Sequence, residues 1–424
     1  MKNIKEEIKE FLYDIKMHPD LTDIKETAER FMDEMDKGLR GENSSLKMIP
    51  TYISADGTPP NDVPVIAIDA GGTNLRIGII KFSEGIPRIC RADKCAMPGT
   101  AGEVSSEEFF SVLADKVLPF ADESDRIGFC FSYPAEISPD CDGKILCFTK
   151  EVRVKNAEGL AAGHELLKKL YEKGGKKELR VTLMNDTAAC LMGGIAAFGL
   201  KNCDGAAGLI LGTGNNSCYI EKGKNIVKLD NAKDMIINCE SGNFSKAVRG
   251  VSDEITDLDS DNPGAYLFEK MLGGAYHGKV ITNTVKLASQ KGLLSKNFSG
   301  GFNDFTAQEL DNFMRGYDNR VSQMCLDSDA QVLRELIDMS YERAAKLVCA
   351  NAAALCLHCE GGKSKRQPFC VIAEGTSFYG SLLLKDKLDR YVKSCLEKEL
   401  SRFVVFRRVE NATLSGAAFA AFLN

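Results

Sequence analysis

The sequence contains no run of apolar residues as long as a membrane span, so we expect no transmembrane segment and no membrane partner. Its first residues, Met-Lys-Asn-Ile-Lys-Glu-Glu-Ile, are charged and lack the apolar core of a secretory signal peptide. We therefore expect a chain that is not exported.

Two common nucleotide-binding motifs are also missing. The chain has two glycine-rich turns, at 71–72 and 212–214, and neither reads Gly-x-Gly-x-x-Gly or leads straight into a helix. A Rossmann dinucleotide site therefore fits poorly, and the lack of Gly-Lys-Ser/Thr after either turn argues against a Walker A loop. The net charge is −6, with acidic and basic residues interspersed, which argues against a nucleic-acid partner.

Metal-binding patterns are incomplete. The chain has 15 cysteines, but they are scattered within apolar stretches, which indicates reduced core thiols in a cytoplasmic protein. The one Cys-x-x-Cys, Cys356 to Cys359, lacks the second ligand pair of a zinc site, so we interpret it as a helix end. The segment from Asp257 to Asn262 begins like a calcium loop but lacks its glycine and terminal glutamate. We interpret it as an acidic surface loop.

The most informative segment that is present covers residues 65–82. A β-branched run ends at Asp69, two glycines follow at Gly71 and Gly72, and Thr73 and Asn74 precede a second apolar run. This pattern predicts a hairpin with a glycine-rich tip, where the backbone approaches a ligand closely and directs N–H groups at it. A carboxylate beside such a turn suits a hydrated Mg²⁺ on a polyphosphate.

The same pattern recurs at 207–221, where an apolar run meets Gly212, Thr213 and Gly214 and is followed by Asn-Asn and a second apolar run. Two such hairpins suggest a duplicated half-domain facing itself across a cleft. Elsewhere strand and helix patterns alternate, which predicts an α/β fold. The predicted strands cover 65–70, 74–82, 89–96, 126–132, 181–184, 369–372 and 403–406. The predicted helices are two within 1–40 and those at 106–119, 187–198, 385–400 and 415–423, with a mainly helical region at 263–360.

Polar residues interrupt apolar surroundings at several places. Asn185-Asp186-Thr187 lies where a buried strand should end and a helix begin, so Asp186 is either part of a helix cap or a general base. Carboxylates and amides in such a set can match the hydroxyls of a polyhydroxylated ligand. The set consists of Ser132, Thr149, Lys150, Asn185, Asp186, Asn216, Glu240 and Glu269.

These segments, taken in order, resemble the eukaryotic-type hexokinases over nearly the whole chain from about residue 30. The matching motifs are Lys47–Tyr52, Asp69–Arg76, Phe131–Pro134, Phe148–Lys150, Asn185–Thr187, Leu211–Glu221, Asn238–Glu240, Leu267–Met271 and Ser415–Ala418. The resemblance implies the actin-like ATPase fold, two RNase-H-like α/β domains around a cleft. The expected small domain is 62–186 plus 410–424, and the large domain is 1–61 plus 187–409.

The resemblance also implies an activity, the ATP-dependent phosphorylation of a hexose, most simply glucose, at its 6-hydroxyl, which is the first step of glycolysis. It makes Asp186 the base, places Lys150 beside the reacting oxygen, and gives the polar set above to the hexose. It assigns the phosphates and adenosine of ATP, with Mg²⁺ held by Asp69 through water, to three segments. These are Asp69, Gly71, Gly72, Thr73, Asn74 and Arg76; then Gly212, Thr213 and Gly214; and Gly375, Thr376 and Ser377. A monomer or a homodimer is expected.

The chain departs from the family's pattern at one position of the ligand pocket. It has no tryptophan, and Ser241 follows Glu240 where the family usually has that bulky residue. The tightness of the pocket wall and the sugar specificity are therefore undecided from the sequence. Two other functions stay open as well. A non-catalytic sugar sensor would share the fold, and an actin-like or chaperone ATPase would share the phosphate turns.

Overall fold

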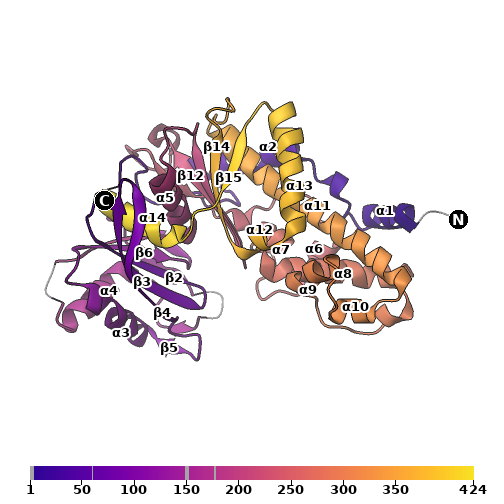
Figure 1. Cartoon of the computed structure of the whole chain (residues 1–424), viewed down its shortest axis with the longest axis horizontal. Coiled ribbons are helices and arrows are strands. Elements are labelled where there is room, and N and C mark those ends of the chain that lie inside the picture. Colours follow the sequence, from indigo (N-terminus) through magenta and orange to yellow (C-terminus); the bar gives the residue numbers. More distant parts are fainter. Residues whose placement is uncertain (1–3, 60, 149–151, 176–177) are drawn as a thin grey trace.

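The computed structural model describes the chain except for residues 1–3, 60, 149–151 and 176–177. Two lobes, each built on one sheet, lie side by side, and the larger lobe extends into a group of helices (Figure 1). The α/β class predicted from the alternating patterns is confirmed.

The sheet of the small lobe has the strand order β10-β6-β2-β3-β4. Strands β2, β3 and β4 form an antiparallel meander, and β6 and β10 continue it in parallel. Their bounds are Val65–Gly71, Asn74–Ser83, Ile86–Ala96, Arg126–Phe131 and Arg180–Met184. Alternation places Ile66 and Ile68 on the face covered by α3 (Ser106–Val117) and α4 (Ala162–Glu172).

The sheet of the large lobe repeats this topology in the order β1-β13-β12-β11-β14-β15. Strands β11, β12 and β13 are antiparallel, and β14 and β15 continue from β11 in parallel. The predicted duplication is therefore confirmed in the topology. The bounds of β1, β11, β12, β13, β14 and β15 are Ile49–Pro50, Ala206–Leu211, Asn215–Glu221, Met235–Asn238, Phe369–Glu374 and Val404–Arg407.

Helices α5 (Asp186–Phe198) and α14 (Ala412–Leu423) lie between the two sheets (Figure 1). α14 packs on β2 and β6, whereas α5 packs on β11, and the two helices contact each other closely. A Cβ at Gly416 would collide with the carbonyl of Ala189, and one at Gly193 with that of Ala412. Glycines at the crossing therefore allow the helix backbones to meet, and one apolar core continues from sheet to sheet.

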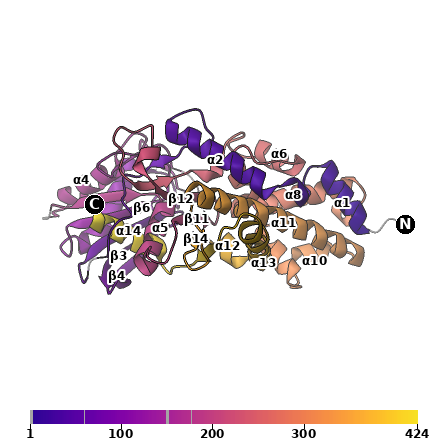
Figure 2. The same ribbon diagram turned by 90° about the horizontal axis from the view of Figure 1, so that it is seen from above.

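The remaining helices extend the large lobe away from the small one. Seen from above, α2 runs along α11, and α1 lies at the end farthest from the C-terminus (Figure 2). α1, α2 and α6 to α13 cover Ile4–Asp14, Ile24–Arg40, Val251–Leu258, Leu267–Leu272, Gly274–Gln290, Ala307–Met314, Arg320–Met324, Asp327–His358, Thr376–Gly380 and Leu382–Tyr391. Short strands β5, β7, β8 and β9 cover Val104–Ser105, Ala135–Ile137, Gly143–Ile145 and Val154–Lys155. Single helical turns occupy Pro19–Leu21, Leu118–Phe120, Gly223–Asn225, Ser241–Asn243 and Lys296–Phe298.

Several local predictions can be compared directly. Helix α11 ends at His358, so Cys356 and Cys359 do flank a helix end. The helix predicted over 385–400 is instead α13 followed by a π-helical segment, Val392–Glu399. None of the helices in the described part of the chain has the length and apolar character that a bilayer crossing requires.

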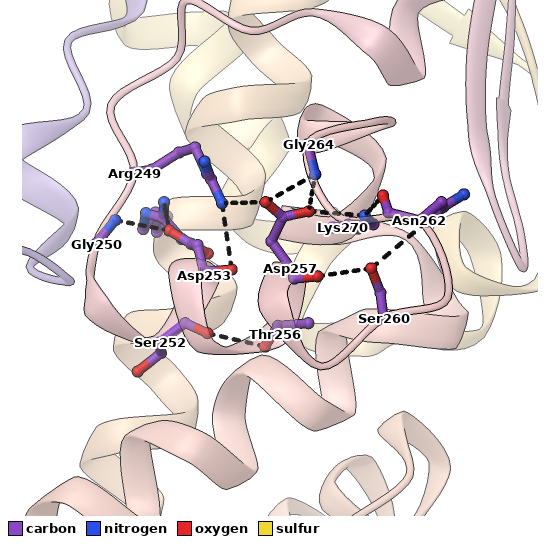
Figure 3. Close-up of polar contacts among 11 residues, drawn as sticks. Arg249, Gly250, Ser252, Asp253, Thr256, Asp257, Ser260, Asn262, Gly264 and Lys270 are labelled. Carbon is purple, nitrogen blue, oxygen red and sulfur yellow. Dashed lines mark hydrogen bonds and ion pairs between the residues drawn. The ribbon is translucent and has the colours of Figure 1, made fainter.

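The prediction that residues 257–262 form an acidic surface loop is wrong for Asp257. This residue belongs to α6 and is buried, because a buried lysine and an arginine from neighbouring segments compensate its charge (Figure 3). Asp259 and Asp261 are exposed, as predicted.

Candidate active site

The first glycine-rich turn joins β2 to β3 in the small lobe, as the hairpin pattern predicted. Asp69 is buried at the end of β2, where Arg76 forms an ion pair with its Oδ2 and the hydroxyl of Thr413 donates to the same atom at 2.9 Å. The hydroxyl of Tyr133 donates to the carbonyl of Gly72 at 3.2 Å and thereby supports the turn. Arg76 is therefore a partner of Asp69 across the hairpin, and Oδ1 is directed towards the turn.

The second turn joins β11 to β12 in the large lobe and is fixed by backbone contacts. The carbonyl of Gly212 accepts from the N–H of Gly274 at 2.8 Å, and that of Thr213 accepts from Ala275 at 3.0 Å. The start of α8 thus holds the turn in place, while the side chain of Thr213 stays exposed.

The segment 375–377 lies against this second turn, although more than 160 residues separate them in the sequence. The hydroxyl of Ser377 donates to the carbonyl of Gly212 at 2.8 Å. Gly375 has φ of +118°, and a Cβ there would collide with the carbonyl of Leu211. Only glycine allows this close approach of β14's end to the turn.

A groove of about 330 Å³ opens beside these two segments in the large lobe. Thr213, Thr376 and Ser377 line it, so the structure brings together two of the three segments predicted to bind a nucleotide. The groove also contains residues that no motif had indicated, because they come from four separate helices. Among them are His277, Gln308, Tyr341 and Leu384.

Asn185 and Asp186 lie where β10 of the small lobe ends and α5 begins. Asn185 is the N-cap, since its Oδ1 accepts from the N–H of Thr187 at 2.9 Å. Asp186 is therefore not needed as a cap, and its partly exposed carboxylate accepts only from the adjacent Thr187 hydroxyl, at 3.3 Å, among the hydrogen bonds of the described residues. Of the two roles left open by the sequence, the cap belongs to its neighbour.

A chain of amides connects this point with the large lobe. Asn216 on β12 donates through Nδ2 to Asn185 at 3.3 Å and to Asn238 on β13 at 2.8 Å. Asn238 in turn donates to Oε1 of Glu240 at 2.8 Å. Three residues of the predicted polar set therefore lie together at the interface of the lobes, with Asn238 between two of them. Asn238 stands in the motif Asn238–Glu240, in which only Glu240 had a predicted role.

Glu240 is held in an unusual backbone conformation. Its φ of 56° lies in the left-handed region, which is uncommon for a residue other than glycine and often marks a functional site. Burial raises the pKa of its carboxyl, while the Asn238 hydrogen bond and Lys47 act in the opposite direction. Ser241, the residue after Glu240, is fully buried and donates its N–H to Asn216 Oδ1. Its hydroxyl accepts from Nδ2 of Asn215 at 3.4 Å, so only its backbone N–H bonds to Asn216.

Glu269 reaches the second turn from α7. Its Oε2 accepts from the N–H of Asn215 at 2.9 Å, and a Cβ at Gly214 would collide with the same oxygen. The carboxylate of Glu269 and the turn at 212–214 are therefore in direct contact, which places a predicted hexose-binding group beside a predicted phosphate-binding turn.

A buried ion pair between Lys270 of α7 and Asp257 of α6 holds α7 in place (Figure 3). Lys270 is 1% exposed and donates to Asp257 Oδ1 and to the carbonyl of Asn262, both at 2.7 Å. Burial raises the pKa of Asp257, but Lys270, the N–H of Gly264 and Arg249 together hold it below the ordinary value. Because α7 has only six residues, such an anchor determines how its neighbour Glu269 is presented.

The other predicted residues have different outcomes. Ser132 is buried at the end of β6, where its N–H donates to the carbonyl of Ala70 at 3.2 Å, beside the first turn. Thr149 and Lys150 lie outside the described residues.

The arrangement combines two backbone turns suited to phosphates, one on each lobe, with carboxylates and amides suited to hydroxyls between them. Such a site can align a triphosphate with a polyhydroxylated acceptor. The acidic groups do not form a metal cage, because no group of three or more metal-binding side chains occurs in the described residues.

Comparisons with known proteins agree with this geometry. Two family models, both described as hexokinase, match residues 7–196 and 206–423. Hexokinase-3 of Homo sapiens is 32% identical over 276 residues, which is 61% of this chain and 29% of that protein. Hexokinase-1 of Saccharomyces cerevisiae is 27% identical over 372 residues, which is 78% of this chain and 75% of that protein. The match thus spans less than a third of the mammalian relative's length.

Among solved structures, the hexokinase of Schistosoma mansoni complexed with glucose superposes with a TM-score of 0.79 at 23% identity. The superposition covers 99% of this chain and 98% of the other. This likeness shows that the expected fold, with two related lobes around a cleft, is correct.

Proposed function

Since the chain belongs to the hexokinase family, we propose that it transfers the terminal phosphoryl group of ATP to the 6-hydroxyl of a hexose, with glucose as the first candidate. The observation that carries this proposal is the contact between Glu269 and the turn at 212–214. It places a hydroxyl-binding carboxylate next to a phosphate-binding turn in one site.

In this proposal the hexose lies between the lobes. Its hydroxyls donate to Glu240 and Glu269 and contact Asn185, Asn216 and Ser132. Asp186 accepts the proton of the 6-hydroxyl as the oxygen attacks the γ-phosphorus, and ADP leaves with the bridging oxygen. We extend the assignment to Thr149 and Lys150 from the family resemblance alone.

ATP would lie with its phosphates between the two turns and its adenosine in the groove beside 375–377. Mg²⁺ commonly keeps several waters and takes few protein carboxylates besides the phosphates. A single carboxylate, Asp69, with Oδ1 directed towards the first turn, fits that requirement. The ion would neutralise charge on the triphosphate, and the chain's own residues position and orient the reactants.

The test is a coupled assay of ADP formation with a panel of hexoses, followed by NMR identification of the phosphorylated hydroxyl. We expect turnover that depends on hexose and a 6-phosphate product. Hexose binding without turnover would favour the sugar sensor, and ATP hydrolysis that is independent of hexose would favour the chaperone-like ATPase.

The two-lobe arrangement leads to a prediction about coupling between the substrates. Because the turns are on different lobes, a hexose contacted from both should favour a closed state through differential contacts. ATPase activity without hexose should be a small fraction of the hexose-dependent rate, although water is abundant. X-ray scattering should show a smaller radius of gyration with glucose. If ATP were hydrolysed without hexose as fast as it is used with hexose, turnover would not depend on closure of the lobes.

A second prediction concerns the anchor of α7. Lys270→Met should raise the KM for hexose more than the KM for ATP, because Glu269 loses its fixed orientation. Breaking a buried ion pair should also lower the free energy of unfolding by about 3–5 kcal/mol.

The matched control for this prediction is Arg343→Met. Arg343 on α11 and Asp253 on α6 form a similarly buried pair, with Nη2 and Oδ2 at 2.6 Å, and neither residue belongs to α7. Denaturation should show a similar loss of stability in both variants, whereas the hexose KM should rise only in Lys270→Met. An equal rise in both would reduce Lys270 to a general stabilising role.

We further propose a cytoplasmic location and a monomer or homodimer. All 15 cysteines are free, which supports a reducing compartment. The packing of α14 on β2 and β6 supports the domain division of 62–186 plus 410–424 against 1–61 plus 187–409.

A further inference from the structure

In the chain of amides at the lobe interface, backbone contacts determine which atom of each asparagine donates and which accepts. Oδ1 of Asn216 accepts from two backbone N–H groups, those of Ser217 at 2.7 Å and Ser241 at 3.2 Å. A backbone N–H can only donate, so the atom facing it must be the amide oxygen. The Nδ2 of Asn216 must then face Asn238.

The orientation of Asn238 follows from the same reasoning. Its Oδ1 accepts from Asn216 Nδ2 at 2.8 Å and lies 3.4 Å from the N–H of Glu240. Its Nδ2 is therefore directed at Oε1 of Glu240, 2.8 Å away. Asn238 is 4% exposed and lies on the rigid strand β13, so this orientation has little freedom to change.

We propose that Asn238 is a positioning residue for the hexose: Asn216 holds it in one orientation, and its Nδ2 in turn fixes which oxygen of Glu240 faces the ligand. Oε1 of Glu240 is occupied by Asn238, which leaves Oε2 to receive a hydroxyl of the ligand. On the other side, Asn185 Oδ1 is occupied by Thr187 N–H, so its NH₂ group is left to donate to the ligand. At the two ends of this amide chain, Glu240 thus offers the ligand an acceptor and Asn185 offers it a donor.

The substitution Asn238→Asp tests this direction with almost no change in shape. It replaces the donor facing Glu240 by an acceptor, so two carboxylates then share one buried contact. The charged groups around Glu240 are Lys47 and Asp186, and the titratable phenol of Tyr266 also lies near it. The added like charge should raise the pKa of the Glu240 carboxyl.

The expected result is a shift of the pH dependence of kcat/KM for hexose in one direction. Ionised Glu240 accepts the ligand hydroxyl, so hexose affinity is lost as pH falls through the pKa of this carboxyl. In Asn238→Asp the acid limb of the kcat/KM profile for hexose should move to higher pH. At neutral pH the KM for hexose should rise by roughly tenfold or more, while the KM for ATP changes little.

The chain offers a matched control in Asn225→Asp. Asn225 Nδ2 donates to Oε1 of the buried Glu221 at 2.8 Å, which is the same type of bond with the same length, far from the ligand groups. This variant should leave the hexose KM and the pH profile at wild-type values. If Asn238→Asp fails to fold, Asn238→Leu, which keeps the volume and removes the hydrogen bonds, should show the same rise in hexose KM.

The inference rests on the proposed function, and calorimetry separates the two. Wild-type protein that binds hexose without turning it over would overturn the proposed enzyme activity but keep Asn238 testable through hexose affinity. A hexose affinity and pH dependence in Asn238→Asp equal to wild type, or equally changed in Asn225→Asp, would overturn the role of Asn238.

Discussion

Replacing Asp186 by asparagine is expected to lower kcat by on the order of 10²–10⁴ while hexose affinity stays close to that of the wild type. The structural reason is that the hydrogen bond of this carboxylate within the described residues can also be made by an amide. Asn185 already caps α5, and an asparagine carbonyl at 186 can still accept from the Thr187 hydroxyl. What the substitution removes is the group that takes the proton of the 6-hydroxyl.

The measurement is kcat in the coupled assay together with glucose affinity by calorimetry on the same preparation. Asp93→Asn is a suitable control, because Asp93 is exposed on the edge strand β4 and the change removes the same charge from the same lobe. Turnover of Asp186→Asn near the wild-type rate would refute its role as base.

Replacing Glu269 should act mainly on hexose binding. A hydrogen bond to a charged acceptor contributes about 1.5–3 kcal/mol, so Glu269→Ala should weaken hexose affinity by roughly 10- to 150-fold. Glu240→Ala should have an effect of similar size, because its carboxylate is offered to the same ligand. ATP affinity should change little in either variant.

Glu269→Gln separates the two contacts of this side chain. The amide oxygen of the glutamine can still accept from Asn215 N–H, so the turn at 212–214 keeps its support. An NH₂ group, which donates, replaces the other carboxylate oxygen. Hexose KM should therefore rise in both Glu269→Gln and Glu269→Ala, and any loss of ATP affinity should be confined to Glu269→Ala. Weakened ATP binding with unchanged hexose binding in both variants would show that the assigned pocket is wrong.

Much of the local structure could be predicted from the sequence. The glycine-rich hairpins and the start of α5 after a buried strand depend on residues within a few positions of each other. Such signals act through backbone preferences and short hydrogen bonds, which do not require the rest of the fold.

The predictions that were wrong or missing concern residues whose surroundings depend on contacts with distant parts of the chain. Asp257 looked like part of a solvated acidic loop, but Lys270 and Arg249 neutralise it and allow burial. Asn238 had no assigned role, since its task depends on Asn216 from another strand. The groove residues on α8, α9, α11 and α13 share no motif, because each helix contributes only one or a few side chains.

The sequence by itself determined the two turns, the repeated hairpins that carry them and the set of carboxylates and amides, because each follows from local periodicity or from a motif. Only the tertiary structure decided which of these groups meet. It placed Ser377 on the carbonyl of Gly212, Asn185 next to Asn216, and Glu269 against Asn215. These contacts join segments 31 to 165 residues apart, and they form only when both sheets and the glycine-lined crossing of α5 and α14 are in place.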